Sequence, residues 1–234
     1  MAELTAAAVL AWQLVTRGDA TLIETVQRSL EVSLLAVAVA SVIGLTLGAL
    51  LAVTRFRGRK LLIVATNALM GLPPVVVGLL VYLLLSRAGP LGAWGLLFTP
   101  TAMVIAQVIL VTPIICALSR QTLEDLWSEY AEQLRSLGVD AWQALRTLLW
   151  EGRYSLLTAI LAGFGRAIGE VGAVLIVGGN IAHVTRVMTT TITLETSRGN
   201  LALALALGLI LIIIAMLVNG TAFVLRELAD SHAS

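Results

Sequence analysis

Charge is scarce in this chain of 234 residues, and so are lysine, histidine and cysteine. Charged residues make up 12% of it, against the roughly 25% of soluble domains, whereas 59% are hydrophobic and the mean hydropathy is +0.96. The formal net charge of +1 gives no basic surface for nucleic acid. A single cysteine, Cys116, excludes a disulfide within the chain, and the two histidines show no metal-ligand spacing. These shortages indicate an integral membrane protein.

Residues that would hydrolyse ATP or a substrate in the membrane are missing too. The only lysine, Lys60, does not belong to a G-x-x-x-x-G-K-[ST] phosphate loop, so the chain cannot hydrolyse ATP itself. A hydrolase within the membrane needs a nucleophile beside a base, but His183 and His232 fall in an outer loop and in the tail. We therefore expect no catalytic residues.

Five apolar segments are long enough to cross a membrane, since ~20 helical residues span the ~30 Å of hydrocarbon. They lie at 29–53, 61–86, 101–118, 155–177 and 201–223. Four cations between residues 55 and 60 place that loop in the cytoplasm, and the other loops follow by alternation. We predict an all-α membrane bundle of about five helices. Its transmembrane domain covers 29–226, between an N-terminal segment 1–28 with an interfacial helix and a C-terminal tail 227–234.

Small residues and prolines mark the first three spans. Small residues recur at every fourth position of the first span, at Ala40, Gly44, Gly48 and Ala52. This pattern predicts close packing against a neighbouring helix. Pro73 and Pro74 in the second span, and Pro113 in the third, remove backbone donors and predict kinks.

A charged, helix-patterned insert, about residues 120–153, separates the third and fourth spans. Thr122 begins a one-sided helix with a capping-box-like start, Gly138 supplies the left-handed residue that ends it, and Asp140 caps a second helix. An amphipathic loop lying on lipid headgroups is one interpretation. However, six acids against four cations from Arg120 to Arg153 would repel anionic lipid, so we favour docking to a soluble protein.

The segment 132–138, Glu-Gln-Leu-Arg-Ser-Leu-Gly, resembles the cytoplasmic "EAA" loop of ATP-binding-cassette importer permeases. Gln133 and Leu134 replace the two alanines of that motif, and Trp150 stands where many members have proline. In that family this short helix seats in a groove of the ATPase subunit. The resemblance therefore implies that the ATPase-coupling residues are Glu129, Glu132, Arg135, Gly138 and Asp140.

Two charged residues fall inside the fourth predicted span. Arg166 and Glu170 lie four residues apart, so they share a helix face and can pair, with Gly165 and Gly169 beside them. Ionisable groups at membrane depth are costly and are functional candidates by default. Two interpretations stay open: an internal ion pair that locks the packing, or an arginine that borders the path of an anion.

The largest outer loop, residues 180–200, is rich in hydroxyl groups, which include those of Thr189 and Thr190. Hydroxyls are suitable donors for an oxyanion, although a polar loop beside a membrane needs no ligand. Residues 163–180 resemble the permeases of the importers for molybdate, sulfate and tungstate, and residues 188–208 are most similar to the tungstate branch. Together the resemblances cover nearly the whole chain.

The resemblance implies a type I ABC importer permease with a cytoplasmic coupling helix, in the cell membrane of a prokaryote. It further implies a homodimer in membrane lipid, an extracytoplasmic oxyanion-binding protein, and two separate ATPase subunits that hold ATP and Mg²⁺. Molybdate or sulfate is the alternative substrate. A secondary transporter that uses Arg166 and Glu170 for ion coupling is a further alternative, which internal repeats would favour; the chain shows no convincing duplication.

Overall fold

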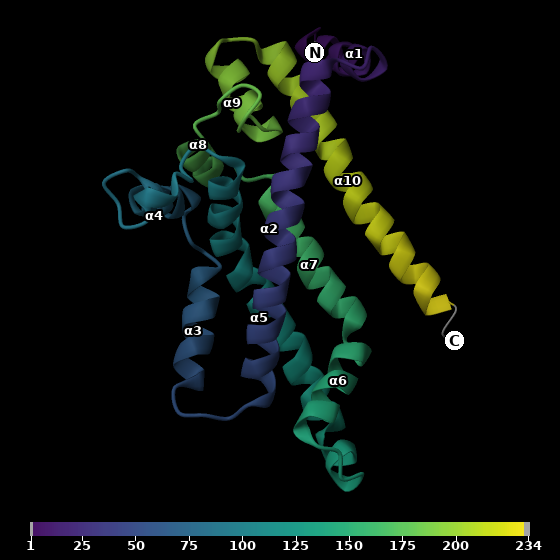
Figure 1. The fold of residues 1–234 in the computed structure, drawn as a ribbon. Coiled ribbons are helices and arrows are strands. Elements are labelled where there is room, and N and C mark those ends of the chain that lie inside the picture. The colour runs from purple at the N-terminus through teal and green to yellow at the C-terminus, as the bar shows by residue number, and fades with distance from the viewer. Residues whose placement is uncertain (1, 232–234) are drawn as a thin grey trace.

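Helices make up most of the backbone of this protein (Figure 1). The computed structural model describes the backbone of residues 2–231, and the side chains of 5–134, 136–140, 142–221 and 223–224. Within these residues the elements are α1 (Ala2–Thr16), α2 (Ala20–Val53), α3 (Arg59–Leu69), α4 (Pro74–Leu85), the 3-10 helix η1 (Gly92–Trp94), α5 (Pro100–Ser136), α6 (Ala141–Glu151), α7 (Arg153–Ile168), α8 (Gly172–Gly178), α9 (Met188–Ser197) and α10 (Leu201–Ser231).

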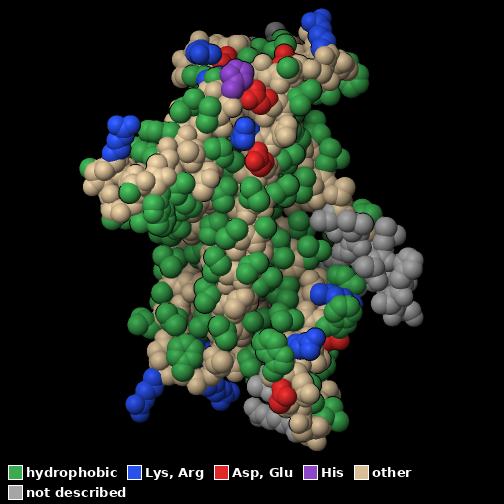
Figure 2. Space-filling view, in the orientation of Figure 1, with side chains coloured by type: hydrophobic (Ala, Val, Ile, Leu, Met, Phe, Trp, Pro, Cys, Tyr) green, Lys and Arg blue, Asp and Glu red, His purple; other side chains and the backbone are tan. Residues whose placement is uncertain are grey.

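Three helices, α2, α5 and α10, are each long and apolar enough to cross a membrane. Two bent pairs, α3 with α4 and α7 with α8, bring the number to as many as five if each pair is one span. The predicted all-α membrane bundle is confirmed. Acidic and basic side chains gather towards the two ends of the visible face, and hydrophobic side chains cover much of its middle (Figure 2).

The α2–α3 loop and the α5–α6 turn lie at one end of the bundle, whereas α1 and α9 lie at the other (Figure 1). The basic loop and the charged insert thus share one end, as the predicted orientation requires. We refer to this end as the cytoplasmic end.

The packing of α2 against α5 forms the centre of the bundle. A Cβ atom on Gly48 would lie 2.8 Å from the carbonyl oxygen of Cys116, and one on Gly44 would lie 3.0 Å from the side chain of Ile115. Ala40 is fully buried on the same face. The predicted close approach along the small-residue stripe is confirmed.

The second predicted span, 61–86, is two helices rather than one kinked helix. Pro73, in an extended conformation with ψ 122°, precedes α4, and Pro74 is its first residue. Because proline cannot donate to a continuing helix, α3 ends before this pair, and α4 leaves at 102° to it. Pro113, by contrast, lies inside the unbroken helix α5.

The boundaries at the two termini also differ from those expected. Helix α2 begins at Ala20, where the Asp19 carboxylate accepts a hydrogen bond from Leu22 N at 2.8 Å, so the expected boundary at residue 28 falls inside α2. Helix α1 packs against α10, and its interfacial position stays a prediction. Helix α10 continues to Ser231, which makes the start of the expected tail helical; residues 232–234, with His232, lie outside the described residues.

Candidate coupling surface and membrane-embedded ion pair

The cytoplasmic insert is an extension of a membrane helix, since α5 runs unbroken from Pro100 to Ser136. The expected helix start at Thr122 is therefore wrong: no glycine or proline interrupts the backbone there. The cytoplasmic half of α5 buries Leu123 against Leu148 of α6 and Leu156 of α7. A continuous, packed helix can carry motion from one end of the bundle to the other.

The turn that ends α5 follows the prediction. Gly138 has φ +68°, and Val139 N donates to Leu134 O at 3.1 Å, which closes the helix end. A Cβ on Gly138 would meet no atom within 4 Å, so backbone conformation alone favours glycine. The Asp140 carboxylate accepts from Gln143 N at 2.8 Å in a capping box that begins α6.

The tip of the insert exposes both acids and large apolar side chains. Glu129, Glu132 and Asp140 are exposed, and the side chain of Arg135 lies outside the described residues. The apolar side chains exposed here are Leu137 (76%), Trp142 (66%) and Trp150 (67%). Exposed aromatic residues beside charges are typical of a protein-binding surface.

An ionic cluster at the cytoplasmic end ties the α2–α3 loop to α5. Glu124 pairs with both Arg120 and Arg59, and Arg59 Nε also donates to Leu51 O at 2.7 Å. Sequence reasoning missed this cluster because Arg59 and Glu124 are 65 residues apart.

Arg166 and Glu170 form the expected ion pair, but the helix that holds them is broken. Helix α7 ends at Ile168 and α8 begins at Gly172, with a bend of 58°, so residues 155–177, predicted as one helix, form two helices that together can be one span. The side chain of Glu170 is 3% exposed and that of Arg166 is 32% exposed. The carboxylate is therefore held inside the protein, while part of the guanidinium reaches its surface.

Side chains from other helices satisfy the backbone at this break. Gln107 Nε2 of α5 donates to Ala167 O at 3.0 Å, and Thr189 Oγ1 of α9 donates to Glu170 O at 2.9 Å. Glu170 Oε1 accepts from Ala173 N at 3.0 Å and so caps α8. A break at membrane depth is tolerated because protein groups replace the lost helical hydrogen bonds.

The small residues beside the pair lie on an open face of α7. Gly165 and Gly169 are exposed, and a Cβ on Gly165 would meet nothing within 4 Å. Within the described chain these glycines do not pack against another helix. The exposed part of Arg166 is thus free of close helix packing on this side.

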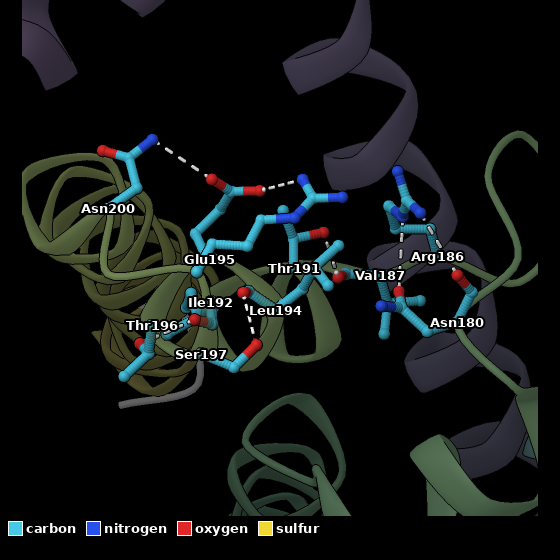
Figure 3. Close-up of polar contacts among 11 residues, drawn as sticks. Asn180, Arg186, Val187, Thr191, Ile192, Leu194, Glu195, Thr196, Ser197 and Asn200 are labelled. Atoms are coloured by element: carbon cyan, nitrogen blue, oxygen red, sulfur yellow. Dashed lines mark hydrogen bonds and ion pairs between the residues drawn. The ribbon is translucent and has the colours of Figure 1, made fainter.

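The hydroxyl-rich outer segment is not one loop, because it contains α9. Thr189 and Thr190 are 6% and 0% exposed, and Thr190 Oγ1 accepts from Val187 N at 3.1 Å. Thr191, Thr196 and Ser197 donate to carbonyl oxygens of their own segment (Figure 3). These hydroxyls support the helix and are not collected into an exposed donor cluster.

Polar contacts hold both ends of this segment (Figure 3). Glu195 accepts from Arg198 Nη1 at 2.8 Å and from Asn200 Nδ2 at 3.1 Å. Before α9, Arg186 Nε donates to Asn180 Oδ1 at 3.3 Å. His183, which the sequence places in an outer loop, is 76% exposed and lies 2.8 Å from a carboxylate oxygen of α2. Of these contacts, only that of His183 joins the segment to another helix.

The structure thus combines two bent helix pairs in an apolar bundle, a long unbroken helix α5, and a helix–glycine–helix tip with exposed acids and tryptophans. Residues 44–232 match the family described as "Binding-protein-dependent transport system inner membrane component". The chain belongs to this family, and it is a non-catalytic inner-membrane permease of an ABC transporter. The predicted membership of the ABC permeases is confirmed, and the ATPase-coupling role of residues 132–138 stays a prediction.

Curated relatives transport anions. The chain is 40% identical over 178 residues to the "Probable anion ABC transporter permease protein" of Haloferax volcanii. The aligned region covers 74% of this chain and 77% of that relative. The chain is 38% identical over 199 residues to the "Tungstate uptake system permease protein TupB" of Peptoclostridium acidaminophilum, covering 85% and 87%. It is 32% identical over 175 residues to the "Sulfate transport system permease protein CysW" of Synechocystis sp., covering 72% and 63%.

Proposed function

We propose that this chain is the permease subunit through which an ABC importer carries tungstate into the cytoplasm. An oxyanion is the common substrate class of the tungstate and sulfate relatives. Tungstate is supported by 38% and 35% identity to two tungstate uptake permeases, against 32% to a sulfate permease. Molybdate and sulfate are the competing substrates, since tetrahedral dianions differ little in shape.

The permease works as a homodimer with two ATPase subunits and an extracytoplasmic oxyanion-binding protein. ATP and Mg²⁺ are held by the ATPases. The dimer is supported by the open face at the end of α7, where Gly165 and Gly169 are exposed beside the Arg166 side chain, which is 32% exposed. An arginine at membrane depth is costly against lipid, and glycines allow a second helix to approach closely, so a second copy of the chain fits this face.

Arg166 offers the translocated anion a partner at the dimer interface. Glu170 sits behind it, bonded to the N-terminus of α8, and neutralises the guanidinium when no anion is present. An anion can exchange with Glu170 as the partner of Arg166, because binding in a translocation path must be favourable enough for entry and still allow release. In this proposal only Arg166 meets substrate, and Glu170 positions it.

The insert transmits the ATPase cycle to the spans. When ATP closes the two ATPases, the docked tip at Gly138 moves, and α5 carries that motion into the membrane as a rigid lever. The continuity of α5 from Pro100 to Ser136 supports this route. The Arg59–Glu124–Arg120 cluster makes the α2–α3 loop follow α5.

ATP-dependent uptake into vesicles tests the proposal. The vesicles hold this chain with its candidate ATPase and binding protein, and tungstate, molybdate and sulfate are compared at equal low concentration. We expect ATP-driven tungstate accumulation that molybdate barely competes with. Uptake that prefers molybdate or sulfate would change the substrate, and uptake that follows an ion gradient without ATP would replace the class by a secondary transporter.

A further inference from the structure

A small buried cavity lies directly behind the break between α7 and α8. Its polar lining comes from four parts of the bundle: Ser29 and Ser33 of α2, Gln107 of α5, Glu170 of the break, and Thr189 of α9. The space open to the centre of a water molecule is about 10 Å³, roughly what one buried water needs. A tetrahedral oxyanion does not fit here, so this cavity is separate from any anion path.

Gln107 is only half satisfied in this position. Its Nε2 donates to Ala167 O at 3.0 Å, but its Oε1 is buried and has no partner within the described residues. The whole residue is 3% exposed. A buried amide oxygen without a hydrogen bond costs about 1–3 kcal/mol, and the cost is greater in a medium without water.

Ser33 is the matching group across the cavity. It is 2% exposed, and the described residues form no hydrogen bond with its hydroxyl. The neighbouring Ser29, by contrast, donates to Thr25 O at 2.7 Å and accepts from Met188 N at 2.8 Å. The cavity therefore has an acceptor on α5 and a hydroxyl on α2 that both retain hydrogen-bonding capacity.

We propose that this cavity binds one water molecule, which bridges Gln107 Oε1 and Ser33 Oγ, and that Gln107 is a positioning residue for the Arg166–Glu170 pair. The water donates to the amide oxygen and exchanges a second hydrogen bond with the serine. The amide nitrogen holds the last turn of α7 through Ala167, the residue next to Arg166. The water thus connects α2 to α5, and Gln107 connects both to the broken span.

The charge balance around the cavity favours a neutral ligand. Glu170 is its only ionisable lining residue, and Arg166 already pairs with that carboxylate. A cation would add an uncompensated positive charge, whereas a water molecule supplies the donor that Gln107 lacks.

Hydrogen–deuterium exchange of the full chain in lipid nanodiscs tests this proposal without any substrate. The reporter is the set of peptides over residues 163–178, which contain the break. Gln107→Met removes both amide contacts at nearly constant length, and we expect at least tenfold faster exchange in these peptides. Ser33→Ala removes only the bridge to water, folds more readily, and is expected to give about fivefold faster exchange.

Two matched controls separate positioning from general destabilisation. Ser41 on α2 and Thr112 on α5 also have buried, unpartnered hydroxyls, but neither lines the cavity. Ser41→Ala and Thr112→Val are expected to leave exchange at the break unchanged.

Exchange at the parent rate in folded Gln107→Met would overturn the positioning role. Equal exchange rates at the break in Ser33→Ala and Ser41→Ala would overturn the bound water. Neither result depends on the transported ion.

Discussion

The chain turns sharply at Gly138 and again at Glu170, and the two turns are stabilised in opposite ways. The first uses neighbouring residues: a left-handed glycine and the Asp140 cap, both exposed to solvent. The second uses Gln107, 60 residues from the carbonyl it binds, and Thr189, 19 residues from its acceptor. Local sequence therefore specifies the cytoplasmic turn, whereas tertiary structure specifies the break in the membrane.

The surrounding solvent explains this difference. Water can satisfy backbone groups at a cytoplasmic turn, so a few local side chains are sufficient there. At membrane depth every freed N–H and C=O must find a protein partner, and the donors to the freed carbonyls of Ala167 and Glu170 come from other helices. A change at the cytoplasmic turn should impair docking and leave the bundle intact, while a change at the break should impair the bundle itself.

The largest expected effect is the loss of one partner of the Arg166–Glu170 pair. Arg166→Met leaves the carboxylate of Glu170, 3% exposed, without its counterion, and we expect a loss of about 3 kcal/mol in stability together with loss of uptake. Thermal unfolding of the purified permease and tungstate uptake measure the two effects.

The double variant Arg166→Met with Glu170→Gln sharpens this prediction. It removes the buried charge altogether, so stability should largely return, whereas uptake should stay absent if Arg166 meets the anion. Recovery of uptake in the double variant would assign the pair to packing alone.

Gly138→Val should have the next largest effect, and it should act only on coupling. A β-branched residue at φ +68° costs about 1–2 kcal/mol, so the tip cannot keep its shape. We expect loss of the complex with the ATPase, measured by co-purification, with normal insertion into the membrane.

Gly138→Asn is the control for this change. Asparagine tolerates the left-handed conformation, and the space around Gly138 is open, so this variant should keep the ATPase bound. Normal co-purification and uptake with valine would show that the turn is not part of the coupling surface.

Trp142→Ala tests whether the exposed apolar side chains of the tip contact the ATPase. Aromatic residues often dominate protein interfaces, and we expect ATPase binding to weaken by about tenfold without a change in permease stability. Trp94→Ala is a matched control, because Trp94 is also 66% exposed but lies in η1, outside the insert. Equal affinities for the two variants would place the ATPase contact elsewhere.

The same contrast explains which features the sequence could predict. The roles of Gly138 and Asp140 follow from residue types at short spacing, and the approach at Gly48 follows from a regular stripe of small residues. The continuity of α5 through Thr122 did not follow, since a capping-box pattern can also occur inside a helix that tertiary packing maintains. The burial of Thr189 could not be predicted either, because its hydroxyl serves a carbonyl on another segment.

The smallest expected effect concerns Glu124, which joins the two types of region. It lies on α5, but it pairs with Arg59, which is 65 residues away in the sequence. Its side chain is 29% exposed. Solvent screens such a pair, so Glu124→Gln should cost only about 1 kcal/mol of stability, a shift of a few degrees in unfolding temperature. Glu31→Gln, at a more exposed pair with Arg28, should change stability less.

If Glu124→Gln also leaves ATP hydrolysis intact while uptake falls severalfold, the cluster transmits motion between α5 and the α2–α3 loop. Uptake that falls only in proportion to the folded fraction would restrict it to stabilising the bundle.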